Sequence, residues 1–291
     1  MNAIEFHSLS KFYGKHRGIE GIDFSVSKGE VFGFIGPNGA GKSTAIRTLL
    51  GLLHPSSGSA SILGHDVVKE GVQARLKVGY LPSEVDFYPE MTSRELLEYH
   101  AGLYGIEKGE KRIEELAQYF ELALDRPIDD LSYGNKKKCA IIQAVLHEPE
   151  VLILDEPTGG LDPFMQNRFF ELLESLNKKG VTVFFSSHIL SEIQRMCDRA
   201  AVIREGKITA IEDISSLLSK QMKKVRLVLK KETKLSLPDG FQNHHSTGSK
   251  HNFDYVGPTE VLIRWLAEQD LVDVVLTEPD LESIFMNYYQ R

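Results

Sequence analysis

Gly36-Pro-Asn-Gly-Ala-Gly-Lys-Ser43 is the stretch that decides the fold of this chain. It matches the phosphate-binding pattern G-x-x-x-x-G-K-[ST]. A short apolar run, Val31–Ile35, precedes it, and a helical pattern from Ser43 to Leu53 follows. Small residues let successive N–H groups wrap a phosphate, and the helix N-terminus adds partial positive charge. A chance glycine-rich turn would not require both flanks, so we predict a nucleotide-binding loop.

Two side chains of this loop carry chemistry of their own. Lys42 can reach the β- and γ-phosphates of a nucleotide, and Ser43 can bind Mg²⁺. Many NTPases share such a loop, so by itself it indicates a nucleotide bound with Mg²⁺. The predicted nucleotide-binding set, assigned to ATP by the resemblance given below, is Gly36, Pro37, Asn38, Gly39, Ala40, Gly41, Lys42, Ser43 and Thr44.

A partner for the metal follows the apolar run Val151–Leu154. Asp155 stands at the carboxyl end of this predicted buried strand, where α/β proteins hold ligands. It can hold Mg²⁺ directly or through water. Glu156, beside it, is suited to accept a proton from the attacking water. The two acids could instead simply cap a strand in solvent, but the phosphate-binding loop favours the catalytic interpretation.

Composition limits the classes of protein that remain. The 291 residues suggest two domains at about 150 residues each. A net charge of -7 argues against broad binding to nucleic acid. Two cysteines, Cys139 and Cys197, are too few for a disulfide framework. The sequence has no apolar stretch of 18 residues and no secretory signal, so we expect a cytoplasmic protein.

Short apolar runs alternate with helical patterns over the first two-thirds of the chain, which indicates an α/β fold. Val181–Phe185 predicts a further buried parallel strand. One amphipathic helix is predicted from apolar residues at positions i, i+3, i+4 and i+7, which are Ile113, Leu116, Ala117 and Phe120.

The character of the sequence changes near residues 215–221. Alternation of Val225, Leu227 and Leu229 predicts a half-buried strand, and the polar stretch Pro238–His251 predicts a loop. A helix, a strand and a second helix are expected at Thr259–Gln269, Leu271–Leu276 and Asp280–Tyr289. His244, His245 and His251 fall in the polar stretch, where we expect solvated side chains and no metal site.

An ordered set of motifs resembles the ATP-binding subunit of an ABC transporter. Leu131-Ser132-Tyr133-Gly134-Asn135 is similar to the family's signature, usually L-S-G-G-Q, and lies 23 positions before Asp155, counted from Ser132. Pro157–Asp162 resembles the D-loop that follows the acidic strand. Ser187-His188 resembles the switch histidine after the next strand. The resemblance covers roughly residues 2–215.

This resemblance implies a role for each matching residue. Glu156, His188 and Lys42 would be catalytic, and Ser43 and Asp155 would hold the metal. Tyr13 would stack on adenine, although it could also pack on the core. Ser132, Tyr133, Gly134 and Asn135 would contact the γ-phosphate bound to an opposing subunit. Ser132 and Gly134 could also be no more than an N-cap for the helix predicted at Lys136–Leu146, and both roles can hold together. His188 could also be purely structural, and Asp162 would belong to the D-loop.

Two positions depart from the family pattern. Gly79-Tyr80-Leu81-Pro82 is followed by Ser83 and Glu84, where the Q-loop usually has glutamine. Neither side chain copies an amide that can both ligate a metal and bond to a partner, although either oxygen could serve. Tyr133 and Asn135 replace a glycine and a glutamine of the signature.

The predicted fold is a P-loop NTPase of the ABC ATPase type. We expect a domain at 1–219, with a helical subdomain at about 85–147, and a small α/β domain at 220–291. The end of the chain, from Glu278 to Phe285, resembles the C-terminal extension of drug- and antibiotic-export subunits; a domain that only packs or dimerises is the alternative.

The resemblance implies a Mg²⁺-dependent ATPase that pairs on ATP as a homodimer or heterodimer. Such a pair would drive a separate membrane permease, held at the inner face of the membrane, for export. One rival is a soluble ABC-type ATPase acting on nucleic acid or ribosomes. DNA-organising relatives need a long coiled coil between Lys42 and Asp155, which are 113 positions apart, and translation-type relatives carry two cassettes. A P-loop kinase would explain neither Leu131–Asn135 nor His188.

Overall fold

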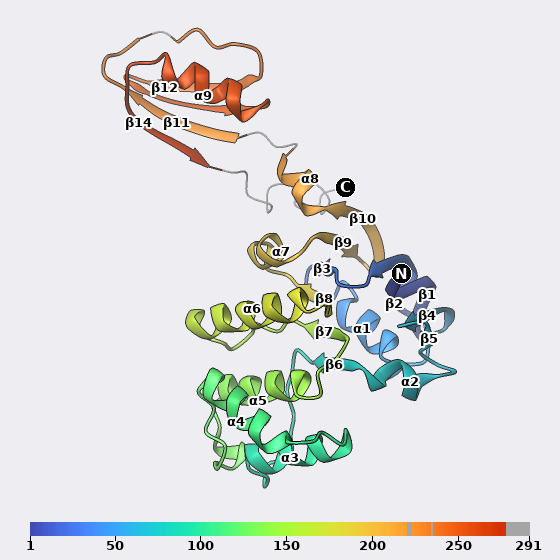
Figure 1. Ribbon diagram of the computed structural model, residues 1–291. Coiled ribbons are helices and arrows are strands. Elements are labelled where there is room, and N and C mark those ends of the chain that lie inside the picture. The colour runs from blue at the N-terminus through green and yellow to red at the C-terminus, as the bar shows by residue number, and fades with distance from the viewer. Residues whose placement is uncertain (220–222, 234, 278–291) are drawn as a thin grey trace. The chain divides into compact units, whose positions relative to one another are not determined.

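The computed structural model describes residues 1–219, 223–233 and 235–277 (Figure 1). The chain divides into two compact units, Met1–Ile211 and Glu212–Arg291. From the sequence we expect this boundary at 219, eight residues later, because the character of the sequence changes near residues 215–221. The strand β10 spans Lys207–Asp213, and the short helix α8, Ile214–Ser219, follows it.

A six-stranded sheet forms the centre of the first unit, with the order β10-β9-β3-β8-β7-β6. The pairs that β3 makes with β8 and β9 are parallel, as are the pairs that β7 makes with β6 and β8. The strands are β3 (Val31–Ile35), β6 (Val78–Leu81), β7 (Val151–Asp155), β8 (Thr182–Ser187) and β9 (Arg199–Arg204). Every residue of β3, β7 and β8 is buried, as the three continuous apolar runs predict.

A second, antiparallel sheet was not predicted by the sequence. Its order is β2-β1-β4-β5, with bounds Asn2–Tyr13 (β1), His16–Ser27 (β2), Ser57–Ile62 (β4) and His65–Asp66 (β5). Phenylalanine rings join the two sheets: Phe24 of β2 stacks on Phe32 of β3 with 5.2 Å between ring centroids, and Phe6 of β1 lies 6.2 Å from Phe184 of β8. Burial of these rings stabilises the contact between the two sheets.

Helices complete the first unit. They are α1 (Lys42–Leu49), α2 (Gly71–Leu76), α6 (Pro163–Lys178) and α7 (Leu190–Met196). Three more helices gather next to β6 and form a helical subdomain (Figure 1, green): α3 (Ser93–Leu103), α4 (Gly109–Phe120) and α5 (Tyr133–Val145), with the 3₁₀ turn η1 (Ile128–Asp130). In α4 the four residues of the predicted apolar face are all buried. Cys139 and Cys197 are free and buried.

The second unit holds an antiparallel sheet with the order β12-β13-β11-β14. Its elements are β11 (Lys223–Leu229), β12 (Phe241–Thr247), β13 (Lys250–Tyr255), α9 (Thr259–Ala267) and β14 (Leu271–Thr277). The buried face of β11 packs with Trp265 of α9, as its alternating pattern predicts. The helix expected at Asp280–Tyr289 and the motif Glu278–Phe285 lie outside the described residues.

The loop predicted at Pro238–His251 is wrong, because most of that stretch belongs to a β-hairpin. Thr247 pairs with Lys250, so Gly248 and Ser249 make a two-residue turn, and Gly248 takes the positive φ of +60° that such a turn needs. β12 is an edge strand whose residues after Phe241 are all exposed. A strand with both faces exposed to water needs no alternation of apolar and polar residues. Its sequence therefore resembles that of a polar loop, which is what we predicted.

Candidate nucleotide site

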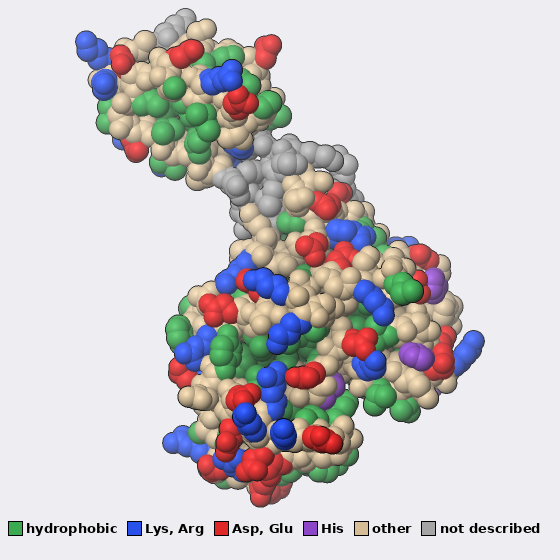
Figure 2. Space-filling model, viewed as in Figure 1, with side chains coloured by type: hydrophobic (Ala, Val, Ile, Leu, Met, Phe, Trp, Pro, Cys, Tyr) green, Lys and Arg blue, Asp and Glu red, His purple; other side chains and the backbone are tan. Residues whose placement is uncertain are grey.

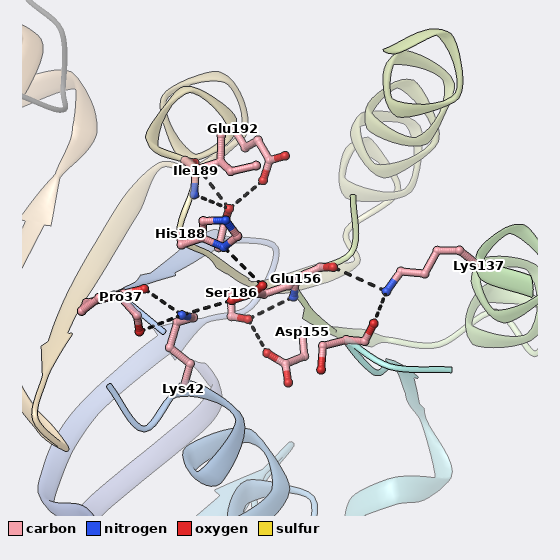
Figure 3. A network of polar contacts seen from close by, with 12 residues as sticks. Pro37, Lys42, Lys137, Asp155, Glu156, Ser186, His188, Ile189 and Glu192 are labelled. Carbon is pink, nitrogen blue, oxygen red and sulfur yellow. Dashed lines mark hydrogen bonds and ion pairs between the residues drawn. The ribbon is translucent and has the colours of Figure 1, made fainter. Parts of the chain in front are cut away.

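The predicted catalytic residues meet at the carboxyl edge of the central sheet (Figure 3). Ile35 at the end of β3 lies beside Ser187 of β8, and Asp155 at the end of β7 lies beside Ser186. The loop after β3 and the residues after β7 and β8 therefore converge on one place. No helix long and apolar enough to cross a membrane occurs in the described part of the chain.

Two glycines of the phosphate-binding loop are required by space and backbone conformation. A Cβ at Gly36 would lie 2.5 Å from the carbonyl oxygen of Ile203. Gly41 has a φ of +108°, and a Cβ there would lie 2.6 Å from the carbonyl oxygen of Gly18. Larger residues would push the loop away from β9, which holds Ile203, and from β2, which holds Gly18. The loop can therefore keep this conformation only with glycine at both positions.

Lys42 begins α1 and is almost completely buried. Its ammonium donates to the carbonyl oxygens of Gly36, at 2.7 Å, and Pro37, at 3.2 Å. It also lies 3.1 Å from Oε1 of Glu156. The cation is thus held at the mouth of the loop by groups that a phosphate oxygen could replace.

Asp155 has one satisfied and one unsatisfied oxygen. Its Oδ1 accepts a 2.6 Å hydrogen bond from the Ser186 hydroxyl, whereas Oδ2 is buried and has no partner in the described structure. A buried carboxylate oxygen without a partner is costly. A divalent cation would satisfy it, and oxygen ligands are those that Mg²⁺ prefers. The donor set of Asp155 and the Ser43 hydroxyl therefore fits Mg²⁺.

Glu156 follows in a left-handed conformation, with φ +48°. Its N–H donates to the carbonyl oxygen of Ser186, at 3.1 Å, and to the Ser186 hydroxyl, at 3.2 Å. Burial raises the pKa of the Glu156 carboxyl, but the hydrogen bonds and charges of Lys42 and His188 outweigh it and hold that pKa below its usual value. The carboxylate is ionised near neutral pH, which is the form that accepts a proton.

His188 completes this network from the residue after β8. Its Nδ1 lies 3.2 Å from Oε2 of Glu156, and the side chain is half-exposed. The turn that presents it is fastened by Ser187, whose hydroxyl donates to Glu192 at 2.6 Å and accepts from the Ile189 N–H at 2.9 Å. The exposure of the ring argues against a structural role in the core, and its side-chain partner is the Glu156 carboxylate.

An open cleft of about 570 Å³ lies beside Lys42 and Glu156. The phosphate-binding loop lines it together with Tyr13, Arg17, Ser83, Glu84, Tyr133 and Glu156. Tyr13, at the end of β1, is 46% exposed, so it does not pack in the core. The Lys11 ammonium lies 5.5 Å from the centroid of the Tyr13 ring.

The signature segment forms the beginning of α5. Ser132 is the N-cap, and its hydroxyl accepts from the Asn135 N–H at 3.4 Å. Gly134 approaches the D-loop so closely that a Cβ there would lie 2.8 Å from the carbonyl oxygen of Gly160. The Tyr133 hydroxyl donates to the Ser83 carbonyl at 3.1 Å. The capping interpretation therefore holds, and Tyr133 faces its own chain.

Three predicted residues remain, and Asp162 is not among those that line the cleft. Asp162 is the N-cap of α6, and its carboxylate accepts from the Met165 N–H at 2.9 Å. Ser83 and Glu84 line the cleft, and the contacts of Ser83 with α5 are made through its backbone oxygen. No group of three or more metal-ligating side chains occurs among the described residues, and His244 bonds to His251 at 3.0 Å between ring nitrogens.

Two residues of this network were not predicted from the sequence. Ser186 holds both Asp155 and Glu156, and the serine pair before His188 was its only signal. Lys137 is fully buried, with its ammonium 2.8 Å from the Pro82 carbonyl oxygen and 3.1 Å from that of Ser83. Three consecutive lysines near the start of a helix predict solvent-exposed side chains. The burial of Lys137 is therefore visible only in the folded chain.

Strand, glycine-rich loop, helix and acidic strand end define a P-loop nucleotide-binding protein. The sequence pattern of the family described as ABC transporter matches residues 19–159. The chain is 40% identical over 222 residues to the linearmycin resistance ATP-binding protein LnrL of Bacillus subtilis, covering 75% of this chain and 71% of that protein. It is 33% identical to the bacitracin transport ATP-binding protein BcrA of Bacillus licheniformis, over 97% and 96% of the two chains.

Solved structures agree with these similarities. One described as the structure of the ATP binding subunit of an ABC transporter superposes with a TM-score of 0.70 at 33% identity, covering 74% of this chain and 91% of its own. The chain belongs to the ABC transporter family, among its ATP-binding subunits. The expected fold class and the expected family are confirmed.

Proposed function

We propose that this chain binds ATP with Mg²⁺ in the cleft beside Lys42 and hydrolyses it to drive a separate membrane permease, for export. The observation that carries the proposal is the convergence of Lys42, Glu156 and His188 on one point next to Asp155. A cation for the phosphates, a base for water and a donor for the γ-phosphate are the parts that phosphoryl transfer needs.

ATP would enter with its phosphates against the loop Gly36–Thr44 and its adenine near Tyr13. Lys42 then exchanges its carbonyl and carboxylate partners for phosphate oxygens, because these carry more negative charge. That exchange frees Glu156 to accept the proton of an attacking water. His188 donates a hydrogen bond to the γ-phosphate, which gains charge as the bond to the leaving oxygen breaks.

Asp155 and Ser43 are the residues proposed to hold Mg²⁺. The buried Oδ2 of Asp155 supports this assignment, because it has no partner among the described residues. When bound, the cation neutralises charge on the phosphates. Ser186 keeps the carboxylate in place through Oδ1, so its orientation does not depend on the ligand.

Two chains would share each site, as a homodimer or a heterodimer. Ser132 is exposed at the N-terminus of α5, and the Asn135 N–H beside it belongs to the first helical turn. A helix N-terminus presented in this way suits a phosphate from another molecule. Hydrolysis would then remove the group that joins the two chains and release them.

A groove of about 610 Å³ supports contact with a permease. It lies between β6 and the helical subdomain, beside the segment 85–88 that continues from Ser83. Large apolar side chains stand exposed along it, among them Leu52, Tyr88, Tyr99 and Leu103. Exposed apolar patches of this kind mark protein–protein contacts. We propose that a permease segment fills this groove and keeps the subunit at the inner face of the membrane.

Export is proposed from the relatives. LnrL is named for linearmycin resistance and BcrA for bacitracin transport, and both are named as ATP-binding proteins. The nucleic acid alternative gains no support, since on the face drawn in Figure 2 basic and acidic side chains are interspersed. We propose, with the bounds predicted from the sequence, that residues 220–291 form a separate small domain.

The proposal is tested by ATP hydrolysis with and without free Mg²⁺. We expect the purified chain to hydrolyse ATP with Mg²⁺ and to lose activity in excess chelator. Asp155→Asn should lower activity at least about a hundredfold. Asp125→Asn, which removes the same charge from a side chain that is 81% exposed and outside the site, is the control. Hydrolysis in chelator at the rate seen with Mg²⁺ would refute the metal assignment.

A further inference from the structure

Two side chains on one face of α5 reach the same backbone oxygen. The Tyr133 hydroxyl donates to the Ser83 carbonyl at 3.1 Å, and the Lys137 ammonium donates to it at 3.1 Å. Positions i and i+4 of a helix lie one above the other, so the two residues act from successive turns. The Ser83 carbonyl is thus held by α5 at two points, although the position lacks the amide side chain that the family uses.

Lys137 extends this contact to the catalytic strand. Its ammonium also donates to the Pro82 carbonyl at 2.8 Å and to the Glu156 carbonyl at 3.4 Å, as Figure 3 shows for Glu156. The side chain has no solvent exposure, and burial lowers the pKa of its ammonium to about 8. A buried ammonium is costly unless its acceptors stay in place. The three carbonyls and the lysine therefore favour one fixed arrangement.

The ring of Tyr133 is fixed as well. A Cβ placed on Gly160 would lie 2.2 Å from this ring, so the tyrosine packs directly on the backbone of the D-loop. Gly160 has a φ of +81°, which only glycine adopts readily. The ring contact restrains the hydroxyl and directs it to Ser83.

We propose that Tyr133 and Lys137 are positioning residues. Their hydrogen bonds connect the helical subdomain to the Ser83 segment and to the Glu156 backbone, so that the three parts shift together. The inference rests on the proposed function, in which Glu156 is the base. Ser83 leads into residues 85–88, which line the proposed permease groove. A displacement in that groove would therefore reach Glu156 through the two donors of α5 and the backbone, without a side chain at position 83.

Removal of either donor should lower turnover and leave ATP binding intact. Tyr133→Phe keeps the ring on Gly160 and removes one hydrogen bond, for which we expect a threefold to tenfold fall in kcat. Lys137→Met removes three donor contacts, and kcat should fall further. Because both residues hold the same carbonyl, the double variant should lose less than the product of the two single effects. KM for ATP and the affinity for a fluorescent ATP analogue should stay within twofold of wild type.

The experiment compares wild type, Tyr133→Phe, Lys137→Met, the double variant and Lys138→Met at one chain concentration. Lys138→Met is the matched control, because it removes the same charge from the next residue of α5. Hydrogen exchange of the peptide containing 82–88 gives a second measurement. It should rise in both donor variants and stay at the wild-type level in the control, while exchange of the Gly36–Thr44 peptide is unchanged.

A Tyr133→Phe variant with wild-type kcat and wild-type exchange at 82–88 would overturn the inference, whether or not Lys137→Met folds. So would fully multiplicative effects in the double variant. Glu156→Gln, measured in parallel, separates this outcome from failure of the proposed function. If Glu156→Gln hydrolyses ATP as wild type does, the base assignment itself is wrong. If it is inactive while the donor variants are fully active, only the positioning role fails.

Discussion

The Lys42 ammonium lies 3.1 Å from Oε1 of Glu156, so the proposed phosphate-binding cation and the proposed base neutralise each other before a nucleotide arrives. His188 contacts the second oxygen of the same carboxylate, at 3.2 Å. An arriving γ-phosphate must separate Lys42 from Glu156. The pair therefore couples entry of ATP to release of the base, and each partner can be tested alone.

Lys42→Ala should lose ATP binding. Removing the ammonium should cost several kcal/mol of binding free energy, because charge-assisted contacts to phosphate are the strong ones. Isothermal titration with ATP and Mg²⁺ measures the loss directly. Lys179→Ala, which removes a cation at an exposed position after α6, provides the control. Wild-type affinity in Lys42→Ala would refute the role of the loop.

Glu156→Gln should accumulate as an ATP-bound dimer. The amide keeps the size of the side chain and removes the base, so ATP binds and hydrolysis stalls. Size-exclusion chromatography with ATP should show twice the monomer mass, and chromatography with ADP should show the monomer. A monomer under both conditions would contradict a site shared by two chains, unless the same variant pairs once the permease is present.

The sequence predicts the site better than its surroundings, for a physical reason. Lys42, Asp155 and Glu156 each follow a local pattern of strand, glycine and charge that needs no knowledge of the fold. The contact of Lys137 with Ser83 spans 54 positions and depends on how α5 packs next to β6. Charge at a helix start gives no sign of burial, so such a lysine is found only in the folded chain.

The same distinction applies to the fold. The buried strands at Val31–Ile35 and Val151–Asp155 are continuous apolar runs, and such runs are recognisable along the sequence. The edge strand β12 has only its first residue, Phe241, partly buried, and it is paired through backbone groups that every residue has. Pairing without burial leaves no pattern in the sequence.

His100 should make the first unit less stable in acid. Burial, with the charge of His147, lowers the pKa of His100 from 6.5 to about 4. Its contribution to stability is complete above pH 6.5 and is lost as the pH falls through 4, because the unfolded chain binds the proton first. The loss should be on the order of 2 kcal/mol, after allowance for water that reaches the groove.

Thermal unfolding between pH 7 and pH 4 tests this expectation. His100→Gln keeps a partner for Gln143, which lies 3.3 Å from the His100 ring, and removes the titrating group. The melting temperature of the variant should therefore fall less steeply with decreasing pH than that of wild type. His54→Gln, at an exposed position, should follow wild type. Parallel curves for wild type and His100→Gln would show that this ring does not contribute.

Turnover per chain should rise with chain concentration, and again when the permease is added. Ser83 replaces the usual amide of the Q-loop, and Tyr133 and Asn135 alter the loop that must close over an opposing γ-phosphate. These changes affect closure of two chains, whereas the phosphate-binding loop of each chain is intact. ATP binding by one chain should be normal, while the competent dimer is sparsely populated.

Observed turnover scales with the population of that dimer, so each 1.4 kcal/mol of deficit in closure lowers it about tenfold. A permease that holds two subunits together raises their effective concentration and offsets the deficit. Steady-state hydrolysis over a dilution series, with and without permease in lipid, measures both effects. Glu156→Gln at each concentration sets the background. A rate per chain that is constant on dilution and unchanged by the permease would mean that each chain hydrolyses ATP alone, and the shared-site mechanism would then be wrong.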